Sequence, residues 1–331
     1  MTRRAGIALC LLSACGFGLM AIFAVRAYDA GVGVTTLLAV RFVLAAVVFW
    51  SIVVLRRRRR TLMEGGAAAR TREDTGATAR RGILLALALG VGYSAQSGLF
   101  FSALRHIDAS LTSLLLYTFP ALVCCGAVLL GRERLTRAKT VALALASAGL
   151  ALTLLGGGSG ELQATGVLLG FGSGIAYSVY ILTAESIVAR VDAWLFSALI
   201  TTGAALTFVL TGAVRGALSA PSGAGWSWIV AIALLCTVLP ISTFLLGMAR
   251  VGAPTASIVS TIEPVITVSL AVVVLGEGLA ALQVAGAVLV LAAIVALQSR
   301  RAGQGVSVAG DDPAPAAAGR AAARTPARDA A

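Results

Sequence analysis

The sequence predicts an all-α integral membrane protein with ten transmembrane helices, arranged as two inverted repeats of five helices. Three observations predict this fold class: the composition, the length of the apolar segments and a repeat within the chain. Of the 331 residues, 59% are hydrophobic and only 12% are charged. About a quarter of the residues of a soluble domain are charged. The composition therefore indicates a chain whose solvent is lipid.

The apolar residues form ten continuous segments of about 20 residues, the length that a helix needs to cross a bilayer. Membrane β-strands would be about ten residues long and would alternate in polarity, so the continuous segments exclude a barrel. Helices are the remaining structure that satisfies every backbone polar group in lipid. The predicted spans are 5–25, 34–55, 82–104, 109–130, 140–157, 164–185, 194–214, 226–248, 253–275 and 280–298.

The positive charges predict the orientation of these spans. If the N-terminus is cytoplasmic, the segments on that side hold 22 of the 26 Lys and Arg residues, and the opposite loops hold only three. Cytoplasmic loops carry such an excess, so both termini of this multi-pass protein are expected in the cytoplasm and the protein in the cell membrane. The run from Arg56 to Arg60 follows a span directly, which favours contact with anionic membrane lipid over binding of nucleic acid.

The chain contains an internal repeat. A shift of 144 residues lays 98–120 over 242–264 without a gap and matches Pro120 with Pro264. A shift of 160 residues matches the first span with the sixth. Because each repeat has an odd number of spans, the second repeat enters the membrane from the opposite side, as in many transporters. The predicted units are a first repeat at 5–157, a second at 158–298 and a disordered tail at 299–331.

The repeated segments carry a family resemblance. "ALRHIDASLTSLLLYTFP" and "PALVCCGAVLLGRERLT" in the first half correspond to "IEPVITVSLAVVVLGEGLA" and "QVAGAVLVLAAIVAL" in the second. Over about 5–298 the chain resembles the drug/metabolite transporter superfamily, specifically its EamA-type ten-helix members. The resemblance implies a central cavity between the repeats, small organic solutes such as amino acids or other metabolites as exported cargo, and no ATP site.

A carboxylate interrupts the ninth span. Pro264 has no amide proton, so it breaks the helix, and Ser260, Glu263 and Thr267 share one helix face near mid-bilayer. Pro120 breaks the fourth span at the equivalent place, and paired broken helices indicate a transport site. Glu263 is a candidate for proton coupling. The alternative is a packing kink in which a neighbour neutralises Glu263.

Arg41 is a second charge within a span, where a cation costs about 2.5–3.5 kcal/mol. Three interpretations are open: an ion pair with Glu263, a cation that holds an anionic group of the cargo, or a structural cap on backbone carbonyls. Gln96, Tyr93 and Tyr177 are further candidates for lining a cavity. For tyrosines, the alternative is a position at the membrane interface.

The remaining features favour a transporter without a cofactor. The five cysteines fall within predicted spans and are expected to be packing residues, and no metal-ligand or hydrolase motif occurs. The expected partners are a small-molecule solute and membrane lipid, and homodimer formation is left open. The predicted function is therefore secondary transport by alternating access, with an intramembrane enzyme or a non-transporting membrane protein as the alternative.

Overall fold

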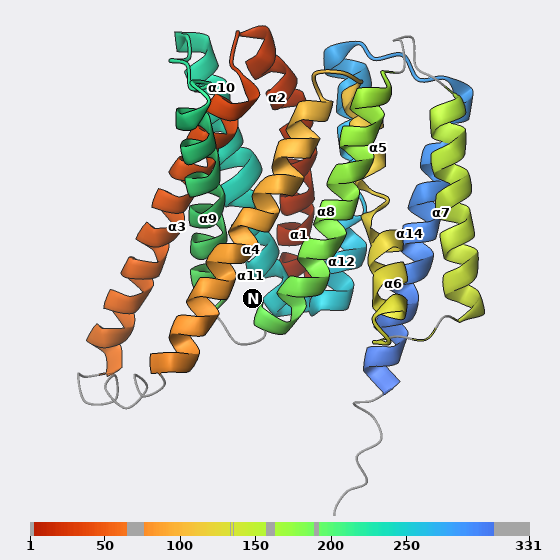
Figure 1. The fold of residues 1–331 in the computed structure, drawn as a ribbon. Coiled ribbons are helices and arrows are strands. Elements are labelled where there is room, and N and C mark those ends of the chain that lie inside the picture. Colours follow the sequence, from red (N-terminus) through yellow and green to blue (C-terminus); the bar gives the residue numbers. More distant parts are fainter. Residues whose placement is uncertain are drawn as a thin grey trace, which may run out of the picture.

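The computed structural model describes residues 3–64, 76–132, 134, 136–156, 163–188 and 192–307, and the regular structure within these ranges is helical (Figure 1). This confirms an all-helical protein. The sequence predicts disorder for 299–331, but residues 299–307 continue the helix α14 (Ala281–Ser307), which overturns the prediction there. Residues 308–331 lie outside the described ranges.

The helices follow one another along the chain, and two π-helical turns, η2 and η3, extend α10 and α13. Their bounds are α1 (Arg3–Gly18), α2 (Met20–Asp29), α3 (Val34–Glu64), α4 (Gly76–Ala103), α5 (Ala109–Leu116), α6 (Phe119–Leu129), α7 (Arg137–Leu155), α8 (Ala164–Val188), α9 (Ala193–Val214), α10 (Gly223–Ala233), η2 (Leu234–Val238), α11 (Leu239–Val251), α12 (Ala253–Ser260), α13 (Glu263–Leu270), η3 (Ala271–Leu275) and α14 (Ala281–Ser307).

Seven helical stretches among the described residues are long and apolar enough to cross a membrane. They are Arg3–Asp29, Val34–Arg59, Gly82–Ala103, Ala109–Leu129, Ala164–Ala184, Ala193–Val214 and Gly223–Val251. Three shorter apolar stretches lie at the other predicted spans: Leu143–Thr153, Glu263–Leu275 and Ala281–Ala293. The protein is therefore a multi-span membrane protein, while the count of ten spans remains a prediction.

Several of these stretches are broken helices. Residues 117 and 118 separate α5 from α6, and residues 261 and 262 separate α12 from α13. In both cases the second helix has a proline in its first two positions, Pro120 in α6 and Pro264 in α13. Proline is tolerated there because the first amide groups of a helix have no partner within it. Each proline thus starts a new helix instead of continuing the preceding one.

Close helix contacts depend on glycine. α4 packs against α9, and Gly90 faces Gly203 so closely that a Cβ on Gly203 would lie 2.4 Å from the Leu87 carbonyl oxygen. α7 and α14 lie side by side at one edge of the bundle (Figure 1), where a Cβ on Gly286 would lie 2.5 Å from the carbonyl oxygen of Gly149. Small residues at helix interfaces are the usual means of packing in lipid, where burial of apolar surface drives no association.

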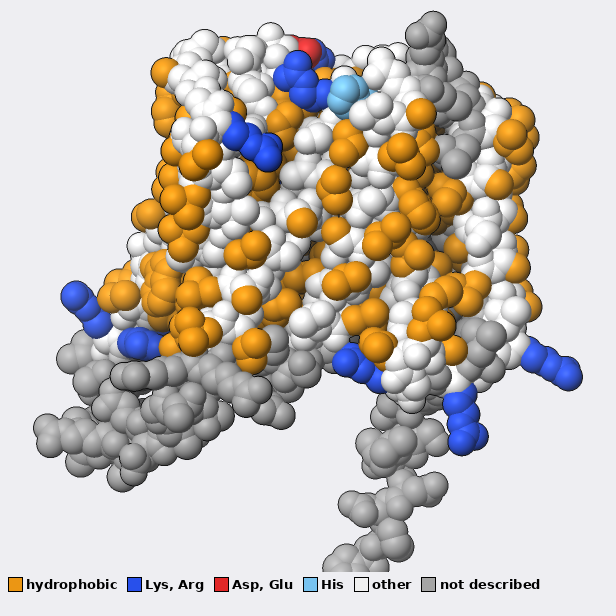
Figure 2. Space-filling view, viewed as in Figure 1, with side chains coloured by type: hydrophobic (Ala, Val, Ile, Leu, Met, Phe, Trp, Pro, Cys, Tyr) orange, Lys and Arg blue, Asp and Glu red, His pale blue; other side chains and the backbone are white. Residues whose placement is uncertain are grey.

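The surface has the distribution of side chains expected for a membrane protein. Figure 2 shows hydrophobic side chains over the whole visible face, with Lys and Arg gathered along the lower edge and a smaller charged group at the upper edge. Large apolar side chains such as Leu129 and Val214 are each 87% exposed. The largest core cluster includes the aromatic rings of Phe42, Phe100 and Phe101.

Candidate functional site

The two breaks at Pro120 and Pro264 are brought together in space. Glu263 is the first residue of α13, and Tyr117 lies in the break between α5 and α6. α13 packs against α5, which brings the Tyr117 and Glu263 side chains close to each other. A carboxyl group from one half of the chain therefore meets a phenol from the other half within the apolar part of the bundle.

The hydroxyl groups near Glu263 bond mainly to their own helices. The Ser260 hydroxyl donates to the Ala256 carbonyl oxygen at 3.0 Å, and the Thr267 hydroxyl donates to the carbonyl oxygen of Glu263 at 3.2 Å. Thr267 is buried, whereas Ser260 and Glu263 are partly buried. Tyr117, in the break between α5 and α6, thus approaches the carboxyl group from the other half of the chain.

Arg41 forms the second polar group, on α3. Its side chain is only 1% exposed, and its Nε donates to the Thr237 hydroxyl at 2.9 Å. The Tyr93 side chain also lies close to the guanidinium. The guanidinium carbon lies 4.7 Å from the ring centroid of Phe42 and 4.9 Å from that of Phe101, distances at which a cation is attracted to the ring face.

One nitrogen of Arg41, an Nη, is buried without a hydrogen-bond partner in the structure. Of the three interpretations of Arg41, the ion pair with Glu263 is not formed: in the described part of the chain, the salt bridge joins Arg26 and Asp29 at 3.6 Å. Among the described residues, Arg41 therefore has a hydroxyl, a phenol and two rings around it, and no salt bridge with a carboxylate.

Thr237 owes its position to the π-helical turn η2. Its hydroxyl donates to the carbonyl oxygen of Ile232, five residues earlier, at 2.9 Å. Such turns are rare and occur frequently at functional sites, because the extra residue per turn displaces side chains from their regular helical positions. No signal in the sequence identifies this partner of Arg41.

A chain of aromatic rings connects the two polar groups. Successive ring centroids are 5.4 Å apart for Tyr93 and Tyr180, 5.9 Å for Tyr180 and Tyr177, 4.7 Å for Tyr177 and Phe119, and 5.7 Å for Phe119 and Tyr117. The two predicted tyrosines, Tyr93 and Tyr177, thus belong to one group. Tyr180 lies between them in this group.

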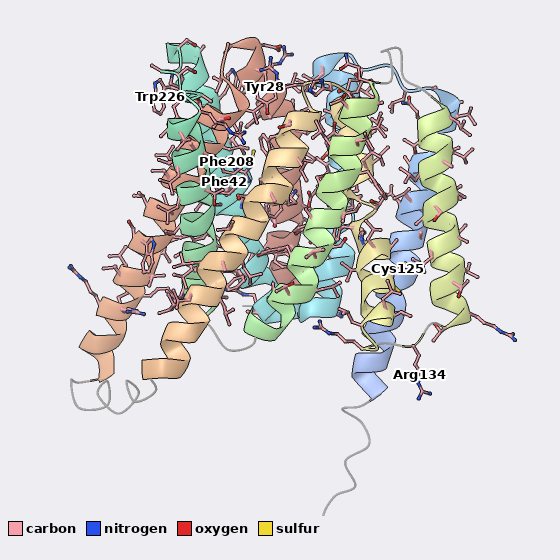
Figure 3. The ribbon with its side chains drawn as sticks, viewed as in Figure 1. Tyr28, Phe42, Cys125, Arg134, Phe208 and Trp226 are labelled. Atoms are coloured by element: carbon pink, nitrogen blue, oxygen red, sulfur yellow. The ribbon has the colours of Figure 1, made fainter. Side chains whose placement is uncertain are left out.

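The arrangement extends beyond Tyr93 to two phenylalanines. Phe42 packs edge-on against Tyr93 and stacks on Phe208 with centroids 5.8 Å apart. Figure 3 shows Phe42 and Phe208 together, with Tyr28 above them. Gln96 is buried and accepts a hydrogen bond from Ser97, and no recorded contact joins it to Arg41 among the described residues.

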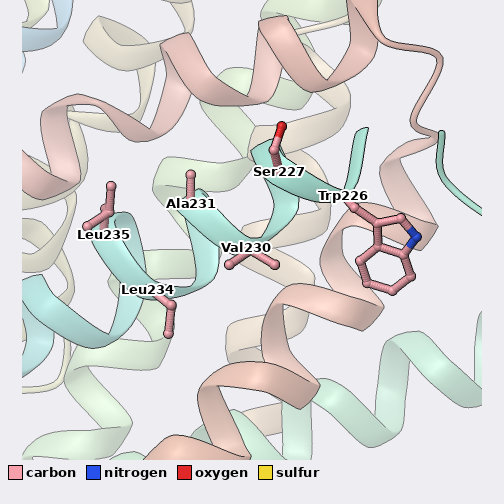
Figure 4. A pocket seen from close by; sticks show the side chains of 6 residues that line it. All are labelled: Trp226, Ser227, Val230, Ala231, Leu234 and Leu235. Atoms are coloured by element: carbon pink, nitrogen blue, oxygen red, sulfur yellow. The ribbon is translucent and has the colours of Figure 1, made fainter. Parts of the chain in front are cut away.

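Two other features lie apart from these groups. An apolar groove on α10 and η2 (Figure 4) is lined by Trp226, Ser227, Val230, Ala231, Leu234 and Leu235, and its large apolar side chains are exposed. All five cysteines are free thiols, and the described residues contain no group of three His, Cys, Asp or Glu side chains that could hold a metal ion. The polar groups around Arg41 and Glu263 are therefore the candidate site.

Sequence reasoning missed Tyr117 and Thr237. Tyr117 had a signal, because an aromatic residue with a hydroxyl directly precedes the break at Pro120 in an otherwise aliphatic segment. Its partnership with Glu263 could not be read from the sequence, since the two residues belong to different halves.

Comparisons with known proteins agree with the helical architecture. The profile of the EamA-like transporter family matches residues 4–155 and 164–298. The threonine/homoserine exporter RhtA of Salmonella typhimurium is 28% identical over 218 residues, which are 63% of this chain and 68% of that protein. An uncharacterized transporter of Archaeoglobus fulgidus is 28% identical over 200 residues, 59% of this chain and 69% of that protein.

One crystal structure superimposes with a TM-score of 0.58 at 20% identity and covers 90% of this chain and 98% of its own, which shows likeness of fold. The profile match covers most of the chain, in two consecutive segments that include both broken helices and both polar groups. The chain is a multi-span membrane transporter and belongs to the EamA-like transporter family.

Proposed function

We propose that this transporter exports small organic solutes, such as amino acids, by alternating access of two inverted five-helix halves, with the cargo held between Arg41 and Glu263. The observation that carries this proposal is the approach of Tyr117 to Glu263, where the breaks of two equivalent helices meet. A site formed by broken helices from both halves changes its exposure when the halves move relative to each other.

The helix packing supports two equivalent halves, 5–157 and 158–298. α4 packs on α8 in the same way that α11, its counterpart, packs on α1. α5 and α6 contact α8, and their counterparts α12 and α13 contact α1. α3 packs against α9, which is its counterpart in the second half, and α7 likewise packs against its counterpart α14. An exchange of the halves therefore leaves this pattern of contacts unchanged, as a two-fold repeat requires.

The charge distribution supports an orientation with both termini in the cytoplasm. The lower edge in Figure 2, where the basic side chains gather, is the edge at which α3 ends and α4 begins. The 22 basic residues assigned to this side would place it against anionic lipid of the inner leaflet. The upper edge would then face the outside.

The two polar groups suit a cargo that carries charge. The unpartnered Nη of Arg41 offers a donor to a carboxylate, and charged hydrogen bonds of this kind are about twice as strong as neutral ones. The name of the relative RhtA, a threonine/homoserine exporter, supports amino acids as the first cargo to test. The rings between Arg41 and Glu263 would form the wall of the cargo site.

Glu263 is the proposed coupling residue. A carboxyl group that is neutral in one conformation and ionised in the other carries a proton across the membrane with each cycle. The test is transport of labelled L-threonine in proteoliposomes. We expect Glu263→Gln, which cannot titrate, to exchange cargo at equal concentrations and to lose accumulation driven by a pH gradient.

The matched control for this test is Glu263→Asp, which keeps a titratable carboxyl group and should retain accumulation driven by the gradient. Gradient-driven accumulation by Glu263→Gln at the wild-type level would refute the coupling role. Loss of both exchange and accumulation, in a variant that is correctly inserted, would assign Glu263 to cargo binding instead.

A further inference from the structure

The N-terminus of α5 is capped by a residue from the other half of the chain. Asp108 is the N-cap residue, with φ −58° and ψ 151°, but its own side chain makes no capping hydrogen bond. Instead, the Glu277 carboxylate accepts a hydrogen bond from the Ala109 amide at 2.7 Å and another from the Ser110 amide at 3.0 Å. An Asp at the N-cap is among the best capping residues, so its displacement by Glu277 is unusual.

Glu277 lies in the short segment between η3 and α14, and a second contact holds the end of η3. The Arg26 guanidinium, on α2, donates to the Val274 carbonyl oxygen at 2.8 Å and also pairs with Asp29. The upper end of the ninth span is thus attached on one side to α2 and on the other to α5. Both attachments join the second half of the chain to the first.

We propose that the contact between Glu277 and the N-terminus of α5 is a latch that holds the outer end of the transporter closed. When this outer gate opens, Asp108 replaces Glu277 as the cap of α5. The closed state has the bidentate contact seen in the structure. In the open state, the end of η3 moves away from α5, and the Asp108 side chain turns inward to accept from the freed amides. This inference rests on the proposed alternating access and adds a positioning residue to the transport cycle.

An exchange of caps explains how the gate can be both tight and reversible. The bidentate contact of the Glu277 carboxylate stabilises the closed state. On opening, Asp108, one residue before the capped amides, accepts hydrogen bonds from them, so that the amides at the helix terminus keep an acceptor. Burial and the neighbouring Glu277 carboxylate raise the pKa of Asp108, which disfavours an ionised Asp108 while the latch is closed. The two carboxyl groups therefore compete for one helix terminus, which gives a two-state element.

The helix terminus in the second half that is equivalent to the N-terminus of α5 cannot form the same latch. The shift of 144 residues places Pro254 opposite Ser110, and a proline has no amide hydrogen to donate. It also places Gly252, with φ 81°, opposite Asp108. The equivalent terminus at α12 therefore lacks both the second donor and the substitute cap. The two gates of the transporter would differ in their chemistry although the halves are related.

The test measures access to a buried position beneath the latch. Ser113 lies on α5, one turn after the capped amides, and is 3% exposed. In a chain whose native cysteines are replaced, Ser113→Cys is labelled from the outside with a membrane-impermeant maleimide. Labelling should be at least tenfold faster in Glu277→Ala and faster to a lesser extent in Glu277→Gln. An unchanged rate in a folded Glu277→Ala variant would overturn the proposal.

A second variant keeps the proposal testable if Glu277→Ala fails to fold. Asp108→Ala removes the substitute cap but leaves the closed contact in place, so labelling of Ser113→Cys should slow at least threefold. Faster or unchanged labelling would overturn the exchange of caps. These measurements need neither cargo nor a pH gradient, so their failure is distinguishable from a failure of the coupling role of Glu263.

Discussion

Replacing Arg41 by methionine separates the two remaining interpretations of this buried cation. Arg41→Met keeps an unbranched side chain that fills a similar volume but removes the charge and all its donors. If Arg41 holds the anionic group of the cargo, the variant should fold normally and lose transport. If Arg41 is a structural cap, the variant should lose stability.

The structure allows the expected change in stability to be worked out. The variant loses one charged hydrogen bond to Thr237, about 1.5–3 kcal/mol, and the contacts of a desolvated cation with Phe42 and Phe101, about 2 kcal/mol each. It is relieved of the cost of a cation within the bilayer, about 2.5–3.5 kcal/mol, and of one unpartnered buried donor, about 1–3 kcal/mol. These contributions nearly cancel, so the free energy of unfolding should change by less than about 2 kcal/mol.

Transport should change far more. Removing one partner of a buried charge pair costs 2–5 kcal/mol, which for the cargo complex means a loss of affinity of about 30-fold or more. The assays are thermal unfolding in detergent and initial rates of L-threonine transport, with Arg41→Lys as the control that retains the charge. A folded Arg41→Met variant that transports at the wild-type rate would refute the anion-binding role. A fall in stability well beyond 2 kcal/mol, with transport lost in proportion, would favour the structural cap.

Two further predictions concern the packing and the orientation. Gly203→Ala should force α4 and α9 apart by roughly 1 Å, because its Cβ would lie 2.4 Å from the Leu87 carbonyl oxygen. We expect this variant to lower stability by about 1–3 kcal/mol in thermal unfolding. Gly92→Ala is the control and should not lower stability, because its Cβ would have no atom within 4 Å. An equal effect of both substitutions would show that helix propensity, and not close approach, controls stability. The orientation can be tested in a chain without its native cysteines. Ala220→Cys should react with an impermeant maleimide in intact cells, whereas Arg59→Cys should react only after permeabilisation. The reverse pattern would show that the proposed orientation is inverted.

The sequence allowed the helical class, the membrane location and the breaks at Pro120 and Pro264 to be anticipated, because apolar length and proline act locally. It singled out Glu263 and Arg41 because a charge within an apolar segment needs compensation. What compensates each charge could not be anticipated. Tyr117 approaches Glu263 from the other half, and a π-helical turn places Thr237 beside Arg41. Such partners depend on how helices far apart in the sequence pack.

The cap that α5 receives from Glu277 also has a consequence for the synthesis of the protein. The Ala109 amide and the Glu277 carboxylate are 168 residues apart, so at 5–20 residues per second the ribosome needs about 10–30 s to supply the cap after α5 has entered the membrane. During this interval Asp108 is the carboxylate at hand for the exposed amides. The nascent first half would therefore insert with its upper end in the arrangement that we assign to the open gate, and the arrival of the last two spans would close the transporter for the first time.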